Sequence, residues 1–200
     1  DVTDDIVSQG APVQISVDSA PVGTVITLDG VETTGEDLTI TASDDVSFTG
    51  GADSLAATGG TATFTLKGAT PGTALGFGTG AAGTVALTDT SMAAIGAGFD
   101  TGIELGQTGQ TGNIAFAGAE LSFDEKVKIW ADGGANVNIA DNLDTVESNA
   151  NSKEIRIAGH ADSDITLAAD LTTDGGQVIS TLGQLFIDGG AIRTINTGGD

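Results

Sequence analysis

The chain has no cysteine and no tyrosine, and it has one tryptophan, one histidine and three prolines in 200 residues. Without cysteine it has no disulfides, thiol nucleophiles or thiolate metal sites. With 4% aromatic residues, its core must consist of aliphatic side chains in thin layers. Such a core suits a solenoid better than a globule organised around large rings. No apolar run approaches the roughly 18 residues that span a bilayer, so we expect no membrane insertion.

Positive charge is also scarce. The chain has 6 Lys and Arg but 28 Asp and Glu, which gives a formal net charge of −22. The chain has no basic stripe that would release counterions from phosphates, which argues against nucleic acid as a partner. The acidic excess favours solubility and cation binding. We therefore expect a secreted protein, extracellular or at the cell surface. Residues 1–5 lack the pattern of a signal peptide, so we expect a mature product or a segment of a longer chain.

Short apolar alternations of period two run through almost the whole chain and predict many short strands. Clusters of Gly, Asp, Asn and Thr separate them, and these residues favour turns. We expect a single β-rich domain over 1–200, with an N-terminal strand within 1–10. Clear examples of the alternation are Val13/Ile15/Val17, Leu38/Ile40/Ala42, Ala62/Phe64/Leu66, Val127/Ile129, Val137/Ile139, Ile155/Ile157 and Ile165/Leu167.

The spacing of the alternations narrows the fold class. Ile129 and Ile139 are about ten residues apart, as are Ile157 and Leu167. This interval fits an all-β parallel β-helix, or solenoid, with turns of roughly 20 residues that hold two or three strands. It also fits an antiparallel β-sandwich or jelly roll. We favour the parallel solenoid because the chain has few prolines and no Asn-Gly hairpin dipeptide.

Three segments interrupt this rhythm and are expected to carry loops. Residues 68–83 are rich in glycine and predict a loop with little to bury. Residues 91–99 predict either a short helical turn or a buried strand. Residues 141–154 are polar and predict a surface excursion with about one helical turn.

The C-terminal segment 164–200 reads DITLAADLTTDGGQVISTLGQLFIDGGAIRTINTGGD, and 38–51 looks like a weaker copy of it. This pattern resembles the repeats of filamentous-haemagglutinin-like and related giant bacterial surface adhesins. The resemblance implies a right-handed parallel β-helix on a secreted surface protein. A short stack with open ends would join its neighbours edge to edge unless it were capped. We therefore predict a structural, self-assembling surface protein, namely a filament, surface-layer or adhesin subunit whose main partner is itself.

Acidic turns favour calcium as a cofactor, because calcium takes six to eight oxygen ligands from carboxylates and turn carbonyls. The segment 133–138 (GGANVN) resembles a degenerate form of the calcium-binding nonapeptide of β-rolls. The same residues also suit ordinary solvated turns, and that alternative stays open here. The candidate calcium ligands are Asp162, Asp164, Asp170, Asp174, Asp188, Asn136 and Asn138.

Four of the six positive charges fall between Lys126 and Arg156, and the only tryptophan lies among them. Period two predicts that Lys126, Lys128 and Arg156 point away from the core. One interpretation is a face for surface glycans, with the indole as a platform. The interpretation we prefer is a contact with the acidic turns of another subunit, and simple solvated strands are the third. The interface candidates are Lys126, Lys128, Trp130 and Arg156.

Catalytic motifs are weak. Residues 78–83 match Gly-x-Gly-x-x-Gly, but a strand-like segment follows instead of the helix that a dinucleotide site needs. His160 has no second His and no Cys with which to build a zinc site or a catalytic triad. We therefore predict that the protein is not an enzyme.

Two alternative functions remain. One is a β-sandwich filament subunit that donates a strand from residues 1–10 to its neighbour. The other is a β-helical polysaccharide lyase or a carbohydrate-binding module, with fold analogy as its only support. The lyase would need a set of residues on one face, namely Asp162, Asp164, Arg156 and Lys128.

Overall fold

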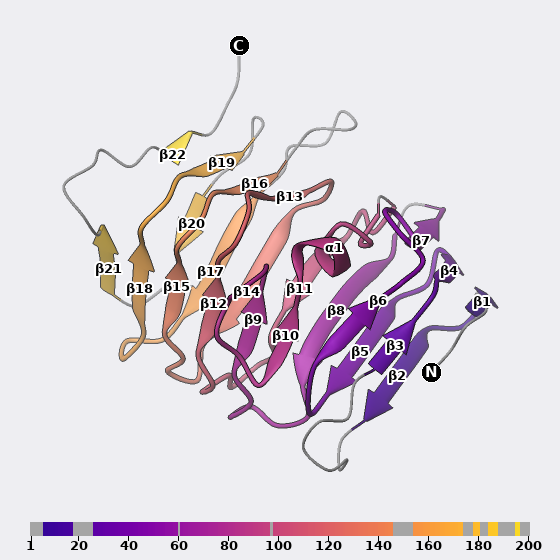
Figure 1. The fold of residues 1–200 in the computed structure, drawn as a ribbon, viewed down its shortest axis with the longest axis horizontal. Coiled ribbons are helices and arrows are strands. Elements are labelled where there is room, and N and C mark those ends of the chain that lie inside the picture. Colours follow the sequence, from indigo (N-terminus) through magenta and orange to yellow (C-terminus); the bar gives the residue numbers. More distant parts are fainter. Residues whose placement is uncertain are drawn as a thin grey trace.

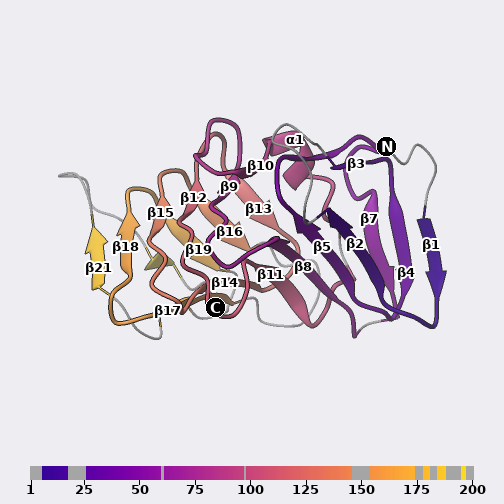
Figure 2. The same ribbon diagram turned by 90° about the horizontal axis from the view of Figure 1, so that it is seen from below.

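The strands of the protein pair side by side in one direction and wind into a parallel β-solenoid of about six turns (Figures 1 and 2). The computed structural model describes residues 6–17, 26–59, 61–96, 98–145, 154–173, 178–180, 184–187 and 195–196. Within these residues every strand pair is parallel, for example β2 with β5 and β14 with β17. The predicted solenoid is confirmed. The alternative of an antiparallel sandwich or jelly roll is wrong, because its strands would have to pair in opposite directions.

Each turn contributes strands to three faces, and we number these faces in the order in which a turn visits them. The first face is a continuous seven-stranded sheet of β2 (Val13–Val17), β5 (Leu38–Ala42), β8 (Thr63–Gly68), β11 (Gly102–Leu105), β14 (Val127–Ala131), β17 (Ile155–Gly159) and β20 (Val178–Ser180). The second face holds the pair β3 (Ile26–Leu28) and β6 (Val46–Phe48), and then β10 (Val85–Leu87), β9 (Leu75–Phe77), β12 (Ile114–Phe116), β15 (Val137–Ile139), β18 (Asp164–Leu167) and β21 (Gln184–Ile187). The third face holds β1 (Ile6–Gln9), β4 (Val31–Thr34) and β7 (Leu55–Thr58), and then β13 (Leu121–Phe123), β16 (Leu143–Thr145), β19 (Leu171–Thr173) and β22 (Ile195–Asn196).

The register along the first face gives the length of a turn. Val13 pairs with Leu38 and Leu38 pairs with Phe64, so these turns take 25 and 26 residues. This is longer than the roughly 20 residues predicted, because every regular turn contains three strands and three corners. The ten-residue spacing in the sequence is the step from one face to the next, as from Ile129 in β14 to Ile139 in β15.

The core lies inside the coil, where alternate residues of all three faces meet. On the first face it contains two columns of buried side chains, one beginning with Leu38 and Phe64 and the other with Ile40 and Leu66. Phe77 and Phe116 stack between successive turns of the second face, with ring centroids 5.1 Å apart. Burial of a large aliphatic or aromatic side chain is worth about 1.5–3 kcal/mol, so the core is stabilised by many similar contributions rather than by one cluster.

One turn is longer than the others and carries an insertion. Phe64 pairs with Ile103, 39 residues later. After β9 the chain turns back and forms β10, which pairs with β9 and approaches β6, where Ala86 N–H donates to Asp45 Oδ1 at 3.0 Å. The second face therefore has one strand more than the regular turns supply.

The inserted segment continues from β10 into the short helix α1 (Asp89–Met92), and Ile95 then forms a parallel bridge with Leu55 of β7. The helix α1 contacts β6 and β10 of the second face (Figure 1). Residues 91–99 thus contain both structures that the sequence left open, a helical turn and a buried strand-like contact. No helix in the described ranges is long and apolar enough to cross a membrane.

Two loop predictions need correction. The glycine-rich segment 68–83 contains β9, whose residues are all buried, because its few apolar residues are concentrated in Leu75–Phe77. Segment 141–154 contains strand β16 where we expected a helical turn. Residues 146–153 of that segment lie outside the described residues.

The carboxylate of Asp89 joins the insertion to the regular coil. It lies in the first turn of α1, and its Oδ1 accepts the N–H of Thr79 at 2.9 Å. This backbone hydrogen bond is the main reason why the pKa of Asp89 is lowered. Hydrogen bonds from the Thr79 hydroxyl and from Ala119 N–H lower the pKa further, and burial has a small opposing effect. Because these donors favour the charged form, the carboxylate stabilises the folded state while it is ionised.

We predict that Asp89→Asn lowers the melting temperature at neutral pH. We also predict that the melting temperature of this variant falls less in acid than that of wild type. The folded-state pKa of Asp89 lies below the usual value of 3.8. Its stabilising effect is therefore complete above that value and is lost as the pH falls through the folded-state pKa. Circular dichroism melts between neutral pH and strong acid measure the effect. Asp100→Asn is the matched control, because it makes the same charge change at a carboxylate that accepts no hydrogen bond within the described residues. Parallel acid profiles for wild type and Asp89→Asn would contradict the prediction.

Candidate binding face on the seven-stranded sheet

All Lys and Arg residues within the described part of the chain lie on the outer side of the first face. Lys67 belongs to β8, Lys126 immediately precedes β14, Lys128 lies within β14, and Arg156 lies in β17. The other two basic residues, Lys153 and Arg193, fall outside the described residues. The chain has a net charge of −22, and all the positive side chains that the structure describes lie on this one surface.

The strand pattern places these side chains outward. In β14 the residues Val127, Ile129 and Ala131 are buried, whereas Lys128 and Trp130 between them are partly exposed. The parallel register then sets Lys128 beside Glu104 of β11 on one side and Arg156 of β17 on the other. The predicted interface residues Lys126, Lys128, Trp130 and Arg156 are therefore brought together on one surface, and their role as a subunit contact stays a prediction.

Glu104 is the centre of this surface. Its Oε2 accepts the indole Nε1–H of Trp130 at 3.0 Å, and its Oε1 lies 3.9 Å from Lys128 Nζ. Lys128 Nζ in turn lies 3.3 Å from the centroid of the Trp130 ring, which is a cation–π contact. These three side chains hold one another in place. Glu104 could not be identified from the sequence, because its partnership with Lys128 depends on a register across 24 residues.

The other cations of this surface have no such partner. Within the described residues no ion pair or hydrogen bond involves the side chain of Lys67, Lys126 or Arg156. Two hollows lie beside them and share Glu104. One, of about 210 Å³, is lined by residues that include Lys126, Lys128, Glu154 and Arg156. The other, of about 290 Å³, lies between Lys67 and Trp130.

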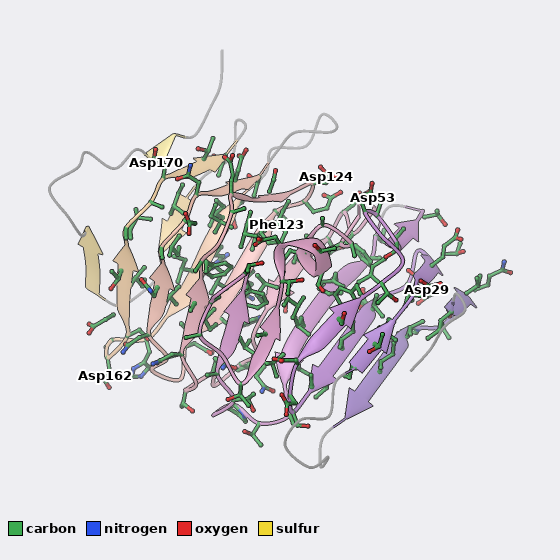
Figure 3. The ribbon with its side chains drawn as sticks, in the orientation of Figure 1. Asp29, Asp53, Phe123, Asp124, Asp162 and Asp170 are labelled. Carbon is green, nitrogen blue, oxygen red and sulfur yellow. The ribbon has the colours of Figure 1, made fainter. Side chains whose placement is uncertain are left out.

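The candidate calcium ligands are spread over different corners. Asp162 lies beside His160, with 3.5 Å between Oδ2 and Nδ1. Figure 3 places Asp162 and Asp170 at opposite edges of the solenoid. Asp174 and Asp188 lie outside the described residues. Within the described ranges no three His, Cys, Asp or Glu side chains are grouped so that they could hold a metal ion, and calcium binding stays a prediction.

Several of these polar residues link successive turns. Asn136 N–H donates to Asn113 Oδ1 at 3.1 Å, and Asp164 N–H donates to Asn136 Oδ1 at 2.9 Å. At another corner Asp170 N–H donates to Asn142 Oδ1 at 3.1 Å. These amides form short ladders between turns, so the corners use their oxygens to satisfy backbone N–H groups.

Carboxylates at other corners do the same. Asp37 accepts the N–H of Thr63 at 2.7 Å, Asp132 accepts that of Gly109 at 2.8 Å, and Asp141 accepts that of Gly118 at 2.8 Å. Hydrogen bonds from backbone N–H groups to ionised carboxylates are among the stronger ones in proteins. Many acidic residues in the turns therefore have a structural role that needs no metal.

A third hollow, of about 330 Å³, is lined by acidic residues that include Asp29, Glu32 and Asp53. It lies near the corners that precede β4 and β7, and Figure 3 labels Asp29 and Asp53 there. Their carboxylates repel one another and attract cations in general. This hollow makes the surface more negative, but its residues indicate no particular ligand or reaction.

The residues proposed for a lyase do not share a face. Lys128 and Arg156 are neighbours on the first face, whereas Asp162 lies at the corner after β17 and Asp164 opens β18 on the second face. The segment 78–83 connects β9 with β10 and leads into no helix, unlike a dinucleotide-binding turn. Comparison of the chain with protein-family models, with curated proteins and with solved structures gives no match.

We predict that Asn136→Ala lowers the free energy of unfolding by about 1 kcal/mol, the usual net worth of a lost hydrogen bond. The substitution removes the acceptor of Asp164 N–H, and chemical denaturation measures the loss. Asn138→Ala is the control, because Asn138 is exposed on β15 and its side chain has no hydrogen bond within the described residues.

The same pair of variants separates a corner ladder from a calcium site. If Asn136 acts through the ladder, the loss is equal in calcium and in chelator. A loss that occurs only in calcium, and for both variants, would show that these amides act as metal ligands instead.

Proposed function

We propose that this chain is a structural module of a secreted surface protein, a filament, surface-layer or adhesin subunit that extends by stacking strands onto a further copy of itself. The observation that carries this proposal is the edge of the first described turn, where no described strand pairs with β1 or β2 on the side away from the coil. Within the described residues β2 pairs only with β5, and β1 only with β4. An unpaired strand edge is a template for pairing with another chain.

The hydrogen-bond pattern identifies the groups that are free at this edge. Val13 N–H donates to Asp37 O at 2.9 Å, toward the next turn. In a parallel ladder alternate residues bond to opposite sides, so Gln14 and Ser16 direct their N–H and C=O groups away from the stack. Ile6 N–H likewise donates to Gly30 O at 3.0 Å, which leaves the groups of Val7 at the free edge.

The core at this end also lacks full cover. Ile6, Val13 and Ile15 point toward the core but are only partly buried, whereas Leu38 and Ile40 in the next turn have no exposed surface. A further turn stacked on β1 and β2 would cover the three half-buried side chains and pair the free backbone groups. Both gains favour association in the direction of the coil.

The sequence adds support for the surface location. The acidic composition and the resemblance of 164–200 to adhesin repeats both favour an extracellular setting. Calcium at the acidic turns stays part of the proposal as an aid to assembly. A donated strand in a β-sandwich is no longer an alternative, because the fold is a parallel solenoid. For the lyase, fold analogy is still the only support.

We predict that Ser16→Pro abolishes self-association of the 200-residue chain and leaves its melting temperature close to that of wild type. Proline removes an N–H that faces the free edge, and edge strands tolerate it there. Light scattering after size exclusion, over a range of concentrations, measures the assembly, and electron microscopy shows its form with calcium and with chelator.

Ile15→Pro is the matched control, because this proline would remove an N–H that pairs with β5 and should lower the melting temperature. A wild-type chain that stays monomeric at every concentration, or a Ser16→Pro variant that assembles normally, would contradict stacking at this edge.

A further inference from the structure

Strand β11 forms the floor of a trough on the first face. Its outward positions are Gly102 and Glu104, and the next outward position, just beyond the strand, is Gly106. Glu104 therefore stands alone between two positions that have no side chain. The neighbouring strands carry larger outward residues, Lys67 on β8 and Trp130 on β14, and these form the walls.

Gly106 keeps one part of this trough open. Its φ of +92° favours glycine, and a Cβ there would lie 3.2 Å from Trp130 Cβ and 3.1 Å from Trp130 O. Any larger residue would be strained there and would crowd Trp130 and Ile114. Gly106 lines the hollow between Lys67 and Trp130 and leaves it without a side chain at this position.

The hollow over Gly106 has the chemistry of a sugar site. The indole of Trp130 lines it, with its Nε1–H bonded to Glu104 and Lys128 Nζ over its ring. These contacts fix the ring, so little side-chain freedom would be lost on binding. Aromatic rings pack well against apolar surfaces, and one face of a pyranose ring presents C–H groups. Hydroxyl groups of Thr65 and Thr108 lie around the same hollow and can bond to sugar hydroxyls.

The hollow on the other side of Glu104 can hold an anion. Its lining includes the cations Lys126, Lys128 and Arg156 and the carboxylates of Glu104 and Glu154, so positive charge is in slight excess. Within the described residues Lys126 and Arg156 have no ion-pair partner. Arginine presents a planar fork that bonds a carboxylate with two N–H groups. The two hollows lie over Gly102 and Gly106, which are two steps of alternate residues, or about 13 Å, apart along one strand. An oligosaccharide of several units is long enough to reach both.

We propose that this trough binds an acidic oligosaccharide, with one pyranose ring beside Trp130 and the carboxylate of a uronic acid unit further along the saccharide on Lys126 and Arg156. One feature favours a saccharide over an acidic turn of a second copy. Cations alone would satisfy an acidic turn, whereas the trough also has a fixed aromatic wall over a glycine floor.

The single tryptophan makes binding directly measurable. We expect oligogalacturonate to change the fluorescence of Trp130, and we expect its affinity to fall as salt is added. Its neutral methyl ester should bind about tenfold more weakly, because it lacks the charge-assisted hydrogen bonds. Arg156→Gln should cause a similar loss for oligogalacturonate and little for the ester. Arg156 is exposed on β17, so this variant should fold.

Trp130→Ala should weaken both sugars, as measured by calorimetry, and its melting curve shows whether it folds. Gln14→Ala is the control, because Gln14 lies on the same face in β2, away from the trough. Equal binding of the acidic and the neutral sugar, or no binding of either, would overturn the proposal. Binding of poly-aspartate as tight as that of oligogalacturonate would also overturn it and would indicate an acidic protein partner.

The experiment is independent of self-association. The Ser16→Pro variant leaves the trough intact, so a monomeric form of it should bind the sugar as wild type does. Failure of assembly and failure of binding can therefore be told apart.

Discussion

The backbone of each turn depends on the next turn for its hydrogen bonds, and this constraint governs the rest of the structure. A strand of three to six residues has no stability by itself. On the first face seven such strands pair in one continuous sheet, so each inner strand is satisfied from both sides. At the corners side chains also connect neighbouring turns. Asn136 and Asp132 each accept a hydrogen bond from a backbone N–H group that strand pairing leaves unbonded.

Much of the fold follows from local patterns in the sequence. Period two places Val127, Ile129, Ile155 and Ile157 in the core, and the same alternation places Lys128 outside. These assignments need only the geometry of a strand. The ten-residue spacing also indicated the solenoid fold. It corresponds to the step from one face to the next and not to a whole turn. The strand β9 was missed because glycine surrounds Leu75–Phe77, and local composition there resembles that of a loop.

Contacts between residues of different turns could not be predicted from the sequence, because the length of a turn varies. Regular turns differ by a few residues, and one takes 39, so no constant period aligns Glu104 with Lys128. The candidate surface could therefore be predicted only in part. Lys126, Lys128, Trp130 and Arg156 were found from the alternation within their own strands, whereas Glu104, Lys67 and the glycines of the trough were not found in this way. The acidic turns suggested metal binding, and the structure shows that many of their oxygens accept backbone hydrogen bonds.

The 39-residue turn has a mechanical consequence. A solenoid pulled at its ends can unwind one turn at a time, because each turn contacts mainly its neighbours. A regular turn of about 25 residues would release roughly 85 Å of chain, and the long turn roughly 130 Å. Under tension this turn would therefore give an extension step about half as long again as those of its neighbours.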